Sequence, residues 1–223
     1  MAGFTCTKQH LKQHTNELFR AHNMNAANEP VFNELGLLNP QIPNEQEIQK
    51  TMLPPHGATF KEWMETRVAR LSTRRYDWDA LKFQSDYDPS YRRAQMRYMG
   101  TGGTGVASDG NTVAAGHFTF STMLIPAGHA GPNHIHYDVE EIFFMLRGKM
   151  KVICEKDGQK WETIVCERDL ISVPPGVYRE EINIGDEDAL MCVMLGSPKP
   201  ITPVYPPGSP LTEIRRQHNA QNP

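Results

Sequence analysis

The clearest pattern in the chain is a series of short apolar runs from residue 113 to residue 195, separated by regularly spaced turn residues. Asp157 and Gly158 stand between two such runs and predict a tight hairpin turn. The predicted strands fall within residues 113–128, 142–173, 179–183 and 189–195. Many short strands with regular turns favour an antiparallel jelly-roll barrel, so the expected fold class is mainly β.

The first hundred residues carry a different pattern. Residues 8–22 place apolar side chains near one helical face, and residues 29–58 are rich in Pro, Asn and Gln. Thr59 and Glu62 match a capping box, which predicts a helix from there to about Leu71. We therefore expect a helical and irregular N-terminal extension over residues 1–100, a barrel over 101–197 and a proline-rich tail over 198–223. Those prolines predict that the tail lies extended on the barrel or on a partner subunit.

Two histidines one residue apart, His134 and His136, are the best candidates for chemistry. In an extended segment residues i and i+2 point to the same face, so both imidazoles can reach one divalent cation. A carboxylate would complete a 2-His-1-carboxylate face with open positions. Strand parity requires a turn at residues 137–139 if Glu141 is the ligand, and periodicity leaves Glu140 as the alternative.

The spacing around these histidines resembles the first signature motif of the cupin superfamily. Gly128, five residues, His134-x-His136, four residues, Glu141, six residues and Gly148 follow that motif. The resemblance selects Glu141 over Glu140. It implies a cupin barrel with His134, His136 and Glu141 as metal ligands.

A second stretch, residues 168–183, resembles the second cupin motif. Pro174-x-Gly176 stands at its turn and Asn183 at its closing asparagine, but Arg168 replaces a glycine and Arg179 replaces the metal-binding histidine. A guanidinium donates no lone pair, and about 5 Å from a divalent ion it would meet roughly 6–7 kcal/mol of repulsion at an effective dielectric of about 20.

Four roles for Arg179 remain open. It could pair with Glu181 on its own face, bind a substrate carboxylate or enolate, pair with Glu141 in a site that has lost its metal, or extend to solvent. His117, on the strand before the first motif, and Tyr178 are further catalytic candidates, with exposure and aromatic packing as the respective alternatives. Phe143 and Met145 share parity with Glu141 and should line the barrel interior, together with other side chains.

The resemblance implies a metal-dependent enzyme, with an Fe(II) dioxygenase acting on a small aromatic or enolisable acid as the leading expectation. The first alternative is a non-oxidative isomerase, lyase or decarboxylase using Mn, Zn or Ni. The second is a metal-free cupin that binds a small molecule. The resemblance also favours a homodimer and an anionic or aromatic small-molecule substrate.

Charge and composition add limits to this picture. The 223 residues carry a net charge of −3, from 23 basic and 26 acidic residues, which predicts no nucleic-acid or membrane partner. The four cysteines form no CxxC pair, and Cys154 should sit opposite Trp161 in the hairpin. With no apolar signal segment at the start, these features predict reduced thiols in a cytoplasmic protein.

Overall fold

The computed structural model describes residues 56–101, 109 and 111–221. The chain divides into two compact units, Met1–Trp63 and Met64–Pro223. In the first unit the Thr59 N–H donates to Glu62 Oε2 over 2.8 Å, and the Glu62 N–H donates to Thr59 Oγ1 over 3.2 Å. The predicted capping box is therefore confirmed. Helix α2 (Phe60–Glu65) follows it and ends six residues before the predicted Leu71. The helix predicted over residues 8–22 lies outside the described residues, as does nearly all of the predicted linker.

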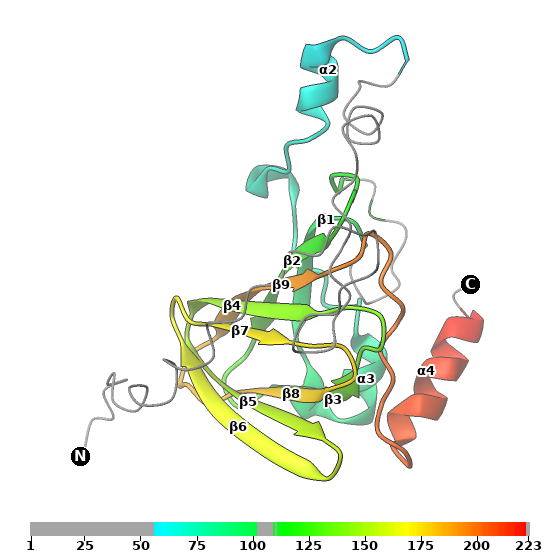
Figure 1. Ribbon diagram of the computed structural model, residues 1–223. Coiled ribbons are helices and arrows are strands. Elements are labelled where there is room, and N and C mark those ends of the chain that lie inside the picture. Colours follow the sequence, from blue (N-terminus) through cyan, green and yellow to red (C-terminus); the bar gives the residue numbers. More distant parts are fainter. Residues whose placement is uncertain (1–55, 102–108, 110, 222–223) are drawn as a thin grey trace, which may run out of the picture. The chain divides into compact units, whose positions relative to one another are not determined.

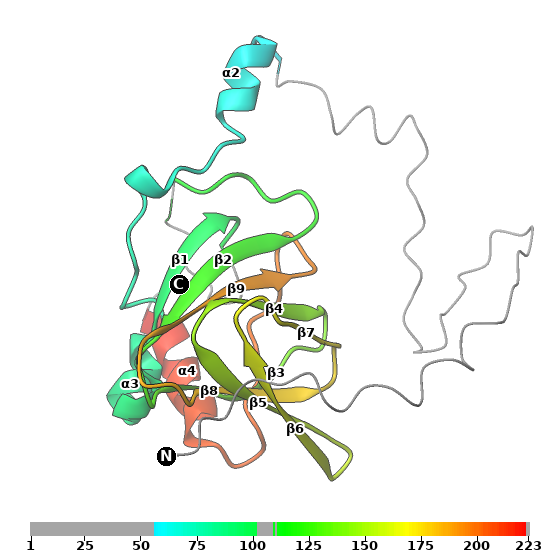
Figure 2. The same ribbon diagram turned by 90° about the vertical axis from the view of Figure 1, so that its left-hand side faces the viewer.

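The second unit consists mainly of nine strands in two antiparallel sheets (Figure 1). The strands are β1 (Ala94–Met99), β2 (Thr119–Ile125), β3 (Ala130–Ile135), β4 (Glu141–Arg147), β5 (Lys149–Lys156), β6 (Gln159–Cys166), β7 (Leu170–Val173), β8 (Tyr178–Asn183) and β9 (Ala189–Leu195). One sheet has the order β1-β2-β9-β4-β7 and the other β3-β8-β5-β6. The two sheets enclose the core as a jelly roll (Figure 2), which confirms the predicted fold class.

Strand β1 belongs to the barrel although it precedes the boundary expected at residue 100. Its sequence, AQMRYM, alternates apolar and polar side chains, and residues 94–97 pair in register with residues 121–124 of β2. Ala94 is fully buried and Met96 is 4% exposed. The barrel therefore begins before the glycine-rich segment at residues 100–105 and not after it.

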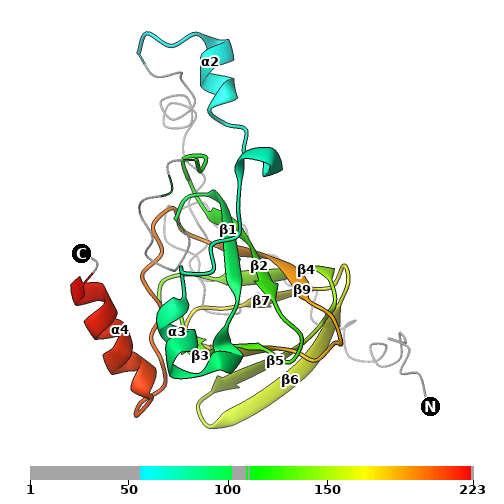
Figure 3. The ribbon, with the colours of Figure 1, turned by 180° about the vertical axis from the view of Figure 1, so that it is seen from behind.

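Short helices accompany the strands in the second unit. They are the 3-10 helices η1 (Leu71–Thr73) and η2 (Pro89–Tyr91) and the α-helices α3 (Lys82–Tyr87) and α4 (Pro210–Gln221). Helix α4 packs beside α3 (Figure 3), where the His218 ring stacks on Phe83 with ring centres 5.0 Å apart.

The C-terminal tail is extended only in its first part. Val204 forms a bridge with Ile135, in which each backbone N–H donates to the other residue's carbonyl over 2.8 and 2.9 Å. The expectation of an extended tail missed α4, because no proline stands between Pro210 and Pro223. Pro210 occupies the first helical position, where a missing N–H costs no helix hydrogen bond.

The hairpin predicted at Asp157-Gly158 joins β5 to β6, and both turn residues have positive φ, 51° and 75°. This combination is typical of the type I′ turn, whose twist matches that of the strands. Cys154 lies opposite Trp161 as expected. Among the described residues, Cys154, Cys166 and Cys192 form no disulfide, and no described helix is long and apolar enough to cross a membrane.

Candidate metal centre

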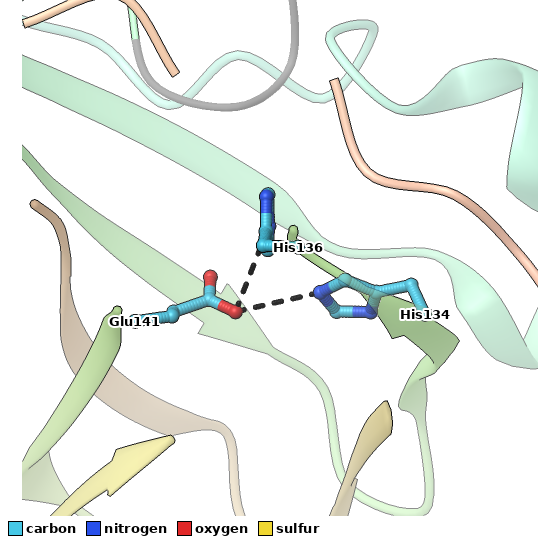
Figure 4. Close-up of side chains that lie close together, drawn as sticks. All are labelled: His134, His136 and Glu141. Atoms are coloured by element: carbon cyan, nitrogen blue, oxygen red, sulfur yellow. Dashed lines mark ion pairs between the residues drawn. The ribbon is translucent and has the colours of Figure 1, made fainter. Parts of the chain in front are cut away.

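The two histidines and Glu141 converge at the start of β4, on the inner side of the barrel (Figure 4). His134 lies near the end of β3 and His136 directly after it, while Glu141 is the first residue of β4 in the other sheet. Residues 137 and 138 form a bend between the strands, so the chain breaks its parity where the sequence required a turn. All three side chains are buried, and their ligand atoms lie within 4.8 Å of one another.

The alternative carboxylate, Glu140, lies outside this group. Its side chain is exposed and accepts a hydrogen bond from the Ser172 hydroxyl. Glu141 is 5% exposed, and its Oε2 lies 3.5 Å from His134 Nε2 and 3.8 Å from His136 Nε2. The structure thus places Glu141 with the histidines and directs Glu140 to the barrel surface.

Backbone contacts from the second motif and from the segment after β9 hold the histidine segment. The Gly176 N–H, in the turn of the second motif, donates to the His136 carbonyl over 2.8 Å. The Val204 bridge fixes Ile135 between the two histidines. The Gly196 N–H donates to the Glu140 carbonyl over 3.0 Å at the entrance to β4. These contacts come from segments far apart in sequence, and they fix the backbone on both sides of the bend.

The protonation pattern of the two imidazoles suits a cation. His134 Nδ1 lies 2.8 Å from the Pro132 carbonyl, which can only accept, so Nδ1 carries a hydrogen and Nε2 is the ring nitrogen that faces Glu141. Burial lowers the pKa of His136 to about 4 despite the nearby Glu141 carboxylate, so the His136 ring is neutral at pH 7. Burial alone would raise the pKa of Glu141, but the two histidines and Arg179 outweigh it and lower the pKa to about 2.

Two imidazoles and an ionised carboxylate therefore face one another inside the barrel. Glu141 Oε2 and His136 Nδ1 are buried and have no hydrogen-bond partner. Ligand atoms about 2.1 Å from a shared ion lie about 3.0–3.4 Å apart, close to the 3.5 and 3.8 Å seen here. The donor set fits a divalent metal, and the chemistry of imidazole and carboxylate accepts several such ions.

Arg179 lies against the same carboxylate. Its side chain is completely buried, its Nε is 3.5 Å from Glu141 Oε2, and its Nη2 donates to the Pro174 carbonyl over 3.4 Å. Neither its Nε nor its Nη1 has a hydrogen-bond partner. Of the four roles open to Arg179, extension to solvent is excluded, and the ion-pair contact is with Glu141 and not Glu181.

The other two catalytic candidates do not reach the site. His117 is exposed in a bend before β2, so it lies outside the strand expected for it, and it does not line the cavity. Tyr178 is the first residue of β8 and by strand alternation faces away from its neighbour Arg179. Burial and the neighbouring Tyr137 raise the pKa of Tyr178.

A cavity opens from the metal centre into the barrel. Apolar side chains from β2, β4 and β9 form much of its wall, including Phe143 as predicted, while Met145 is buried in the core. Burial raises the pKa of Glu181, which also lines the cavity and stands so close to Gly131 that a Cβ there would lie 1.9 Å from its Oε1.

The cavity wall also contains two arginines that were not predicted from the sequence, Arg93 and Arg215. A local sequence pattern does mark Arg93, because Arg93, Gln95 and Arg97 alternate with buried apolar residues at the start of β1. Arg215 lies on α4 and is brought to the cavity by packing between segments that are distant in sequence, for which no local pattern exists.

The family description "Cupin domain" matches residues 121–195. No match to a curated protein was found.

Among solved structures, an oxalate oxidase in complex with the substrate analogue glycolate is 22% identical, with 40% of this chain and 45% of that chain covered and a TM-score of 0.36. An oxalate decarboxylase formate complex from Lactobacillus farciminis is 19% identical over 47% and 32% of the two chains, with a TM-score of 0.40. The cupin domain of Cnp3 from Schizosaccharomyces pombe is 17% identical over 47% and 61%, with a TM-score of 0.38.

The chain spans about half the length of the first two oxalate oxidase structures that it matches, 45% and 54%. The family match covers β2 to β9, and these strands form two antiparallel sheets around the His134, His136 and Glu141 side chains. Residues 121–195 of this chain therefore belong to a cupin domain.

Proposed function

We propose that this protein is a metal-dependent cupin enzyme that binds Fe(II) through His134, His136 and Glu141 and acts as a dioxygenase on a small aromatic or enolisable acid. The observation that carries the proposal is the buried convergence of two imidazoles and one carboxylate beside a cavity. Bound Fe(II) supplies redox chemistry toward dioxygen and open positions for an oxygen donor of the substrate.

The chain's own residues would prepare the site in three ways. The Pro132 carbonyl holds the His134 ring in one tautomer and orientation. The low pKa of Glu141 keeps its carboxylate charged across the physiological range. Apolar side chains such as Met123, Phe143 and Val193 line the cavity and exclude bulk water, which suits the apolar body of an aromatic acid.

Metal content and oxygen uptake test the proposal. Full-length protein from cells supplied with iron, manganese and zinc should hold close to one metal ion per chain by elemental analysis. His134→Ala and His136→Ala should lose it, and Glu141→Gln should weaken it. His117→Ala, a change to an exposed histidine, is the matched control and should retain the metal. Oxygen consumption with catechols and aromatic acids then tests the dioxygenase assignment, and turnover without oxygen uptake would assign the site to a non-oxidative isomerase, lyase or decarboxylase.

One observation favours a second candidate, a metal-free cupin that binds a small molecule. Arg179 Nε lies 3.5 Å from Glu141 Oε2, so the carboxylate already has a permanent cation beside it. In that case wild-type protein would contain no metal after the same growth, and Glu141→Gln would lower stability without changing metal content.

A further inference from the structure

The cavity beside the metal centre contains a second carboxyl group, which the metal centre does not use. This group belongs to Glu181 on β8, whose side chain is 3% exposed and lines the cavity. Glu181 is not a member of the group formed by His134, His136 and Glu141, whose ligand atoms lie within 4.8 Å of one another. Metal binding through those three residues therefore does not explain this buried carboxyl.

The fold places the Glu181 carboxyl on the inner side of the barrel. Buried and partly exposed positions alternate along β8, and Glu181 shares the buried face with Arg179 and Asn183. Strand β3 pairs with β8, and Gly131 is the residue opposite Glu181. A Cβ at Gly131 would lie 1.9 Å from Oε1 and 2.4 Å from Cδ of Glu181, so the carboxyl occupies space that a glycine leaves free. Two paired strands thus fix its position.

One oxygen of this carboxyl has no hydrogen-bond partner. Glu181 Oε2 is buried and accepts no hydrogen bond from any described residue. Arg93 and Arg179 attract the carboxyl electrostatically, but neither donates a hydrogen bond to this oxygen. Because a buried acceptor without a partner is costly, a ligand group that donates to Oε2 would remove this cost.

The charges around Glu181 select among the possible ligand groups. A protonated amine would suit an ionised carboxylate, but Arg93 and Arg179 act on the same position and would repel it. A ligand carboxylate would be repelled by Glu181 itself whenever this residue is ionised. A hydroxyl both donates and accepts, so it can bind Glu181 whether the carboxyl is ionised or protonated. A hydroxyl is therefore the group that best fits this position.

The rest of the cavity wall restricts the body of the ligand. Much of the wall is apolar, with Met123 from β2, Phe143 from β4 and Met191 from β9. Such a wall favours a compact hydrocarbon or aromatic body over a strongly hydrated molecule, and a few polar groups in the wall then fix the orientation of the ligand.

We propose that Glu181 binds a hydroxyl group of the ligand in this cavity, and that the ligand is a compact apolar molecule carrying that hydroxyl, of which a phenol is the simplest aromatic form. The identification of this ligand as the substrate rests on the proposed enzymatic function, in which the small aromatic or enolisable acid would carry a phenolic or enolic hydroxyl. The binding site itself needs only Glu181 and the apolar wall.

Para-fluorophenol and para-fluorotoluene test this assignment, because they differ only by a hydroxyl in place of a methyl group of similar size. Their dissociation constants are measured by fluorine NMR titration of the full-length protein after a chelator has removed any metal, so that no bound ion contributes. Because an unsatisfied buried acceptor is costly, wild-type protein should bind para-fluorophenol at least about fivefold more tightly than para-fluorotoluene.

Replacement of the carboxyl should remove this preference. In Glu181→Met the ratio of the two dissociation constants should fall to about twofold or less while para-fluorotoluene still binds, because only the phenol loses a hydrogen bond. Glu180→Met is the matched control, because Glu180 precedes Glu181 on β8, is only partly buried and faces the other side of the strand. It should keep the wild-type ratio within about twofold.

The proposal is overturned if para-fluorophenol does not bind wild-type protein, if it binds no more tightly than para-fluorotoluene, or if Glu181→Met keeps the wild-type ratio. If Glu181→Met does not fold by circular dichroism, nuclear Overhauser contacts between the para-fluorophenol ring and the Glu181 side chain of wild-type protein decide the question, and their absence overturns the proposal. Failure of the proposed function would look different. The protein would then hold no metal or consume no oxygen, while the stripped protein would still prefer the phenol in a manner that depends on Glu181.

Discussion

At the residue scale, Arg179 is the most informative departure from the cupin pattern. It occupies the position of a metal-binding histidine, and the structure directs it toward Glu141 within the barrel. Its buried charge is offset by Glu141 and, at longer range, by Glu181. A divalent ion held by Glu141 would therefore compete with Arg179 for the same carboxylate, and the net metal affinity depends on the difference between these interactions.

Replacing Arg179 by histidine tests this competition. Arg179→His removes a permanent positive charge and supplies a nitrogen lone pair, so we expect Zn(II) affinity to rise at least about tenfold in a chelator-competition titration. The metal-free variant should lose roughly 3–5 kcal/mol of unfolding free energy in urea, because Glu141 loses a buried partner. Arg216→His, at an exposed position, is the control and should change neither quantity appreciably. Weaker Zn(II) binding by Arg179→His would mean that the arginine supports the metal instead of opposing it.

Gly148 and Gly158 both have positive φ, but only Gly148 has close neighbours. Substitutions at these two positions therefore distinguish the cost of backbone strain from the cost of a steric contact. Gly148 has a φ of 91°, and a Cβ there would lie 2.9 Å from both Cα and Cβ of Ala189, whereas Gly158 has a φ of 75° and open space around it. Gly158→Ala should cost about 1–2 kcal/mol of stability from the left-handed conformation alone. Gly148→Ala should cost about 1–3 kcal/mol more because the backbone of β9 must also shift. Urea denaturation of both variants measures the difference, and equal losses would contradict the contact at Ala189.

At the element scale, the backbone conformation of the turn between β6 and β7 explains why the second cupin motif has a glycine at the position that Arg168 occupies in this chain. Arg168 stands in that position with a φ of 70°, and its N–H donates to the Met145 carbonyl over 2.9 Å. The Asp169 carboxylate closes the turn by accepting from the Cys166 N–H over 2.8 Å. Arg168 therefore adopts the left-handed backbone conformation, which a glycine at this position would adopt without the steric cost of a side chain.

Restoring that glycine should stabilise the protein. Arg168→Gly should raise the unfolding free energy by up to about 1 kcal/mol, since relief of left-handed strain exceeds the larger backbone entropy of glycine in the unfolded chain. Arg168→Ala keeps the strain and should give no gain. The check is the urea midpoint at an unchanged slope, and a gain for alanine equal to that for glycine would assign the effect to the lost arginine side chain instead of to φ.

The sequence was sufficient for elements whose determinants are local. The Asp157-Gly158 hairpin, the Thr59 capping box and the bend between His136 and Glu141 each depend on neighbouring residues, and all three are present. Asn183 illustrates the limit. Its position was recognisable from the motif, but its function as a bridge, with Nδ2 donating to the Ile125 and Glu187 carbonyls over 2.9 and 2.8 Å, requires β2 and β8 to meet in three dimensions.

The features that sequence reasoning missed depend on contacts between distant segments. Arg215 reaches the cavity because α4 packs against Phe83, more than a hundred residues earlier in the chain. Gln84 Nε2 likewise donates to the Tyr205 hydroxyl over 2.6 Å and connects α3 to the tail. Neither contact can be predicted from hydrophobic periodicity. That pattern indicates which face of a helix or strand is buried, but not which other element packs against it.

At the scale of the whole molecule, the candidate metal ligands connect two sheets. His134 comes from β3 in the four-stranded sheet and Glu141 from β4 in the five-stranded sheet. An ion bound by both would link the sheets in the folded state and would find no preformed site in the unfolded chain. Metal binding should therefore appear as added stability of the cupin domain, independently of any catalytic assay.

Metal loading and removal should consequently shift the melting temperature. Zn(II) at a free concentration 100 times its dissociation constant should add about 2.7 kcal/mol to the unfolding free energy. For a protein of this size that corresponds to roughly 5–10 °C in Tm, reversed by excess EDTA. The same Zn(II) addition should leave the Tm of His134→Ala and Glu141→Gln little changed, while His117→Ala should keep the full shift. A shift that persists in His134→Ala would place the bound Zn(II) elsewhere in the chain. A wild-type Tm unaffected by both Zn(II) and EDTA would instead identify the Arg179–Glu141 contact as the permanent occupant of the site.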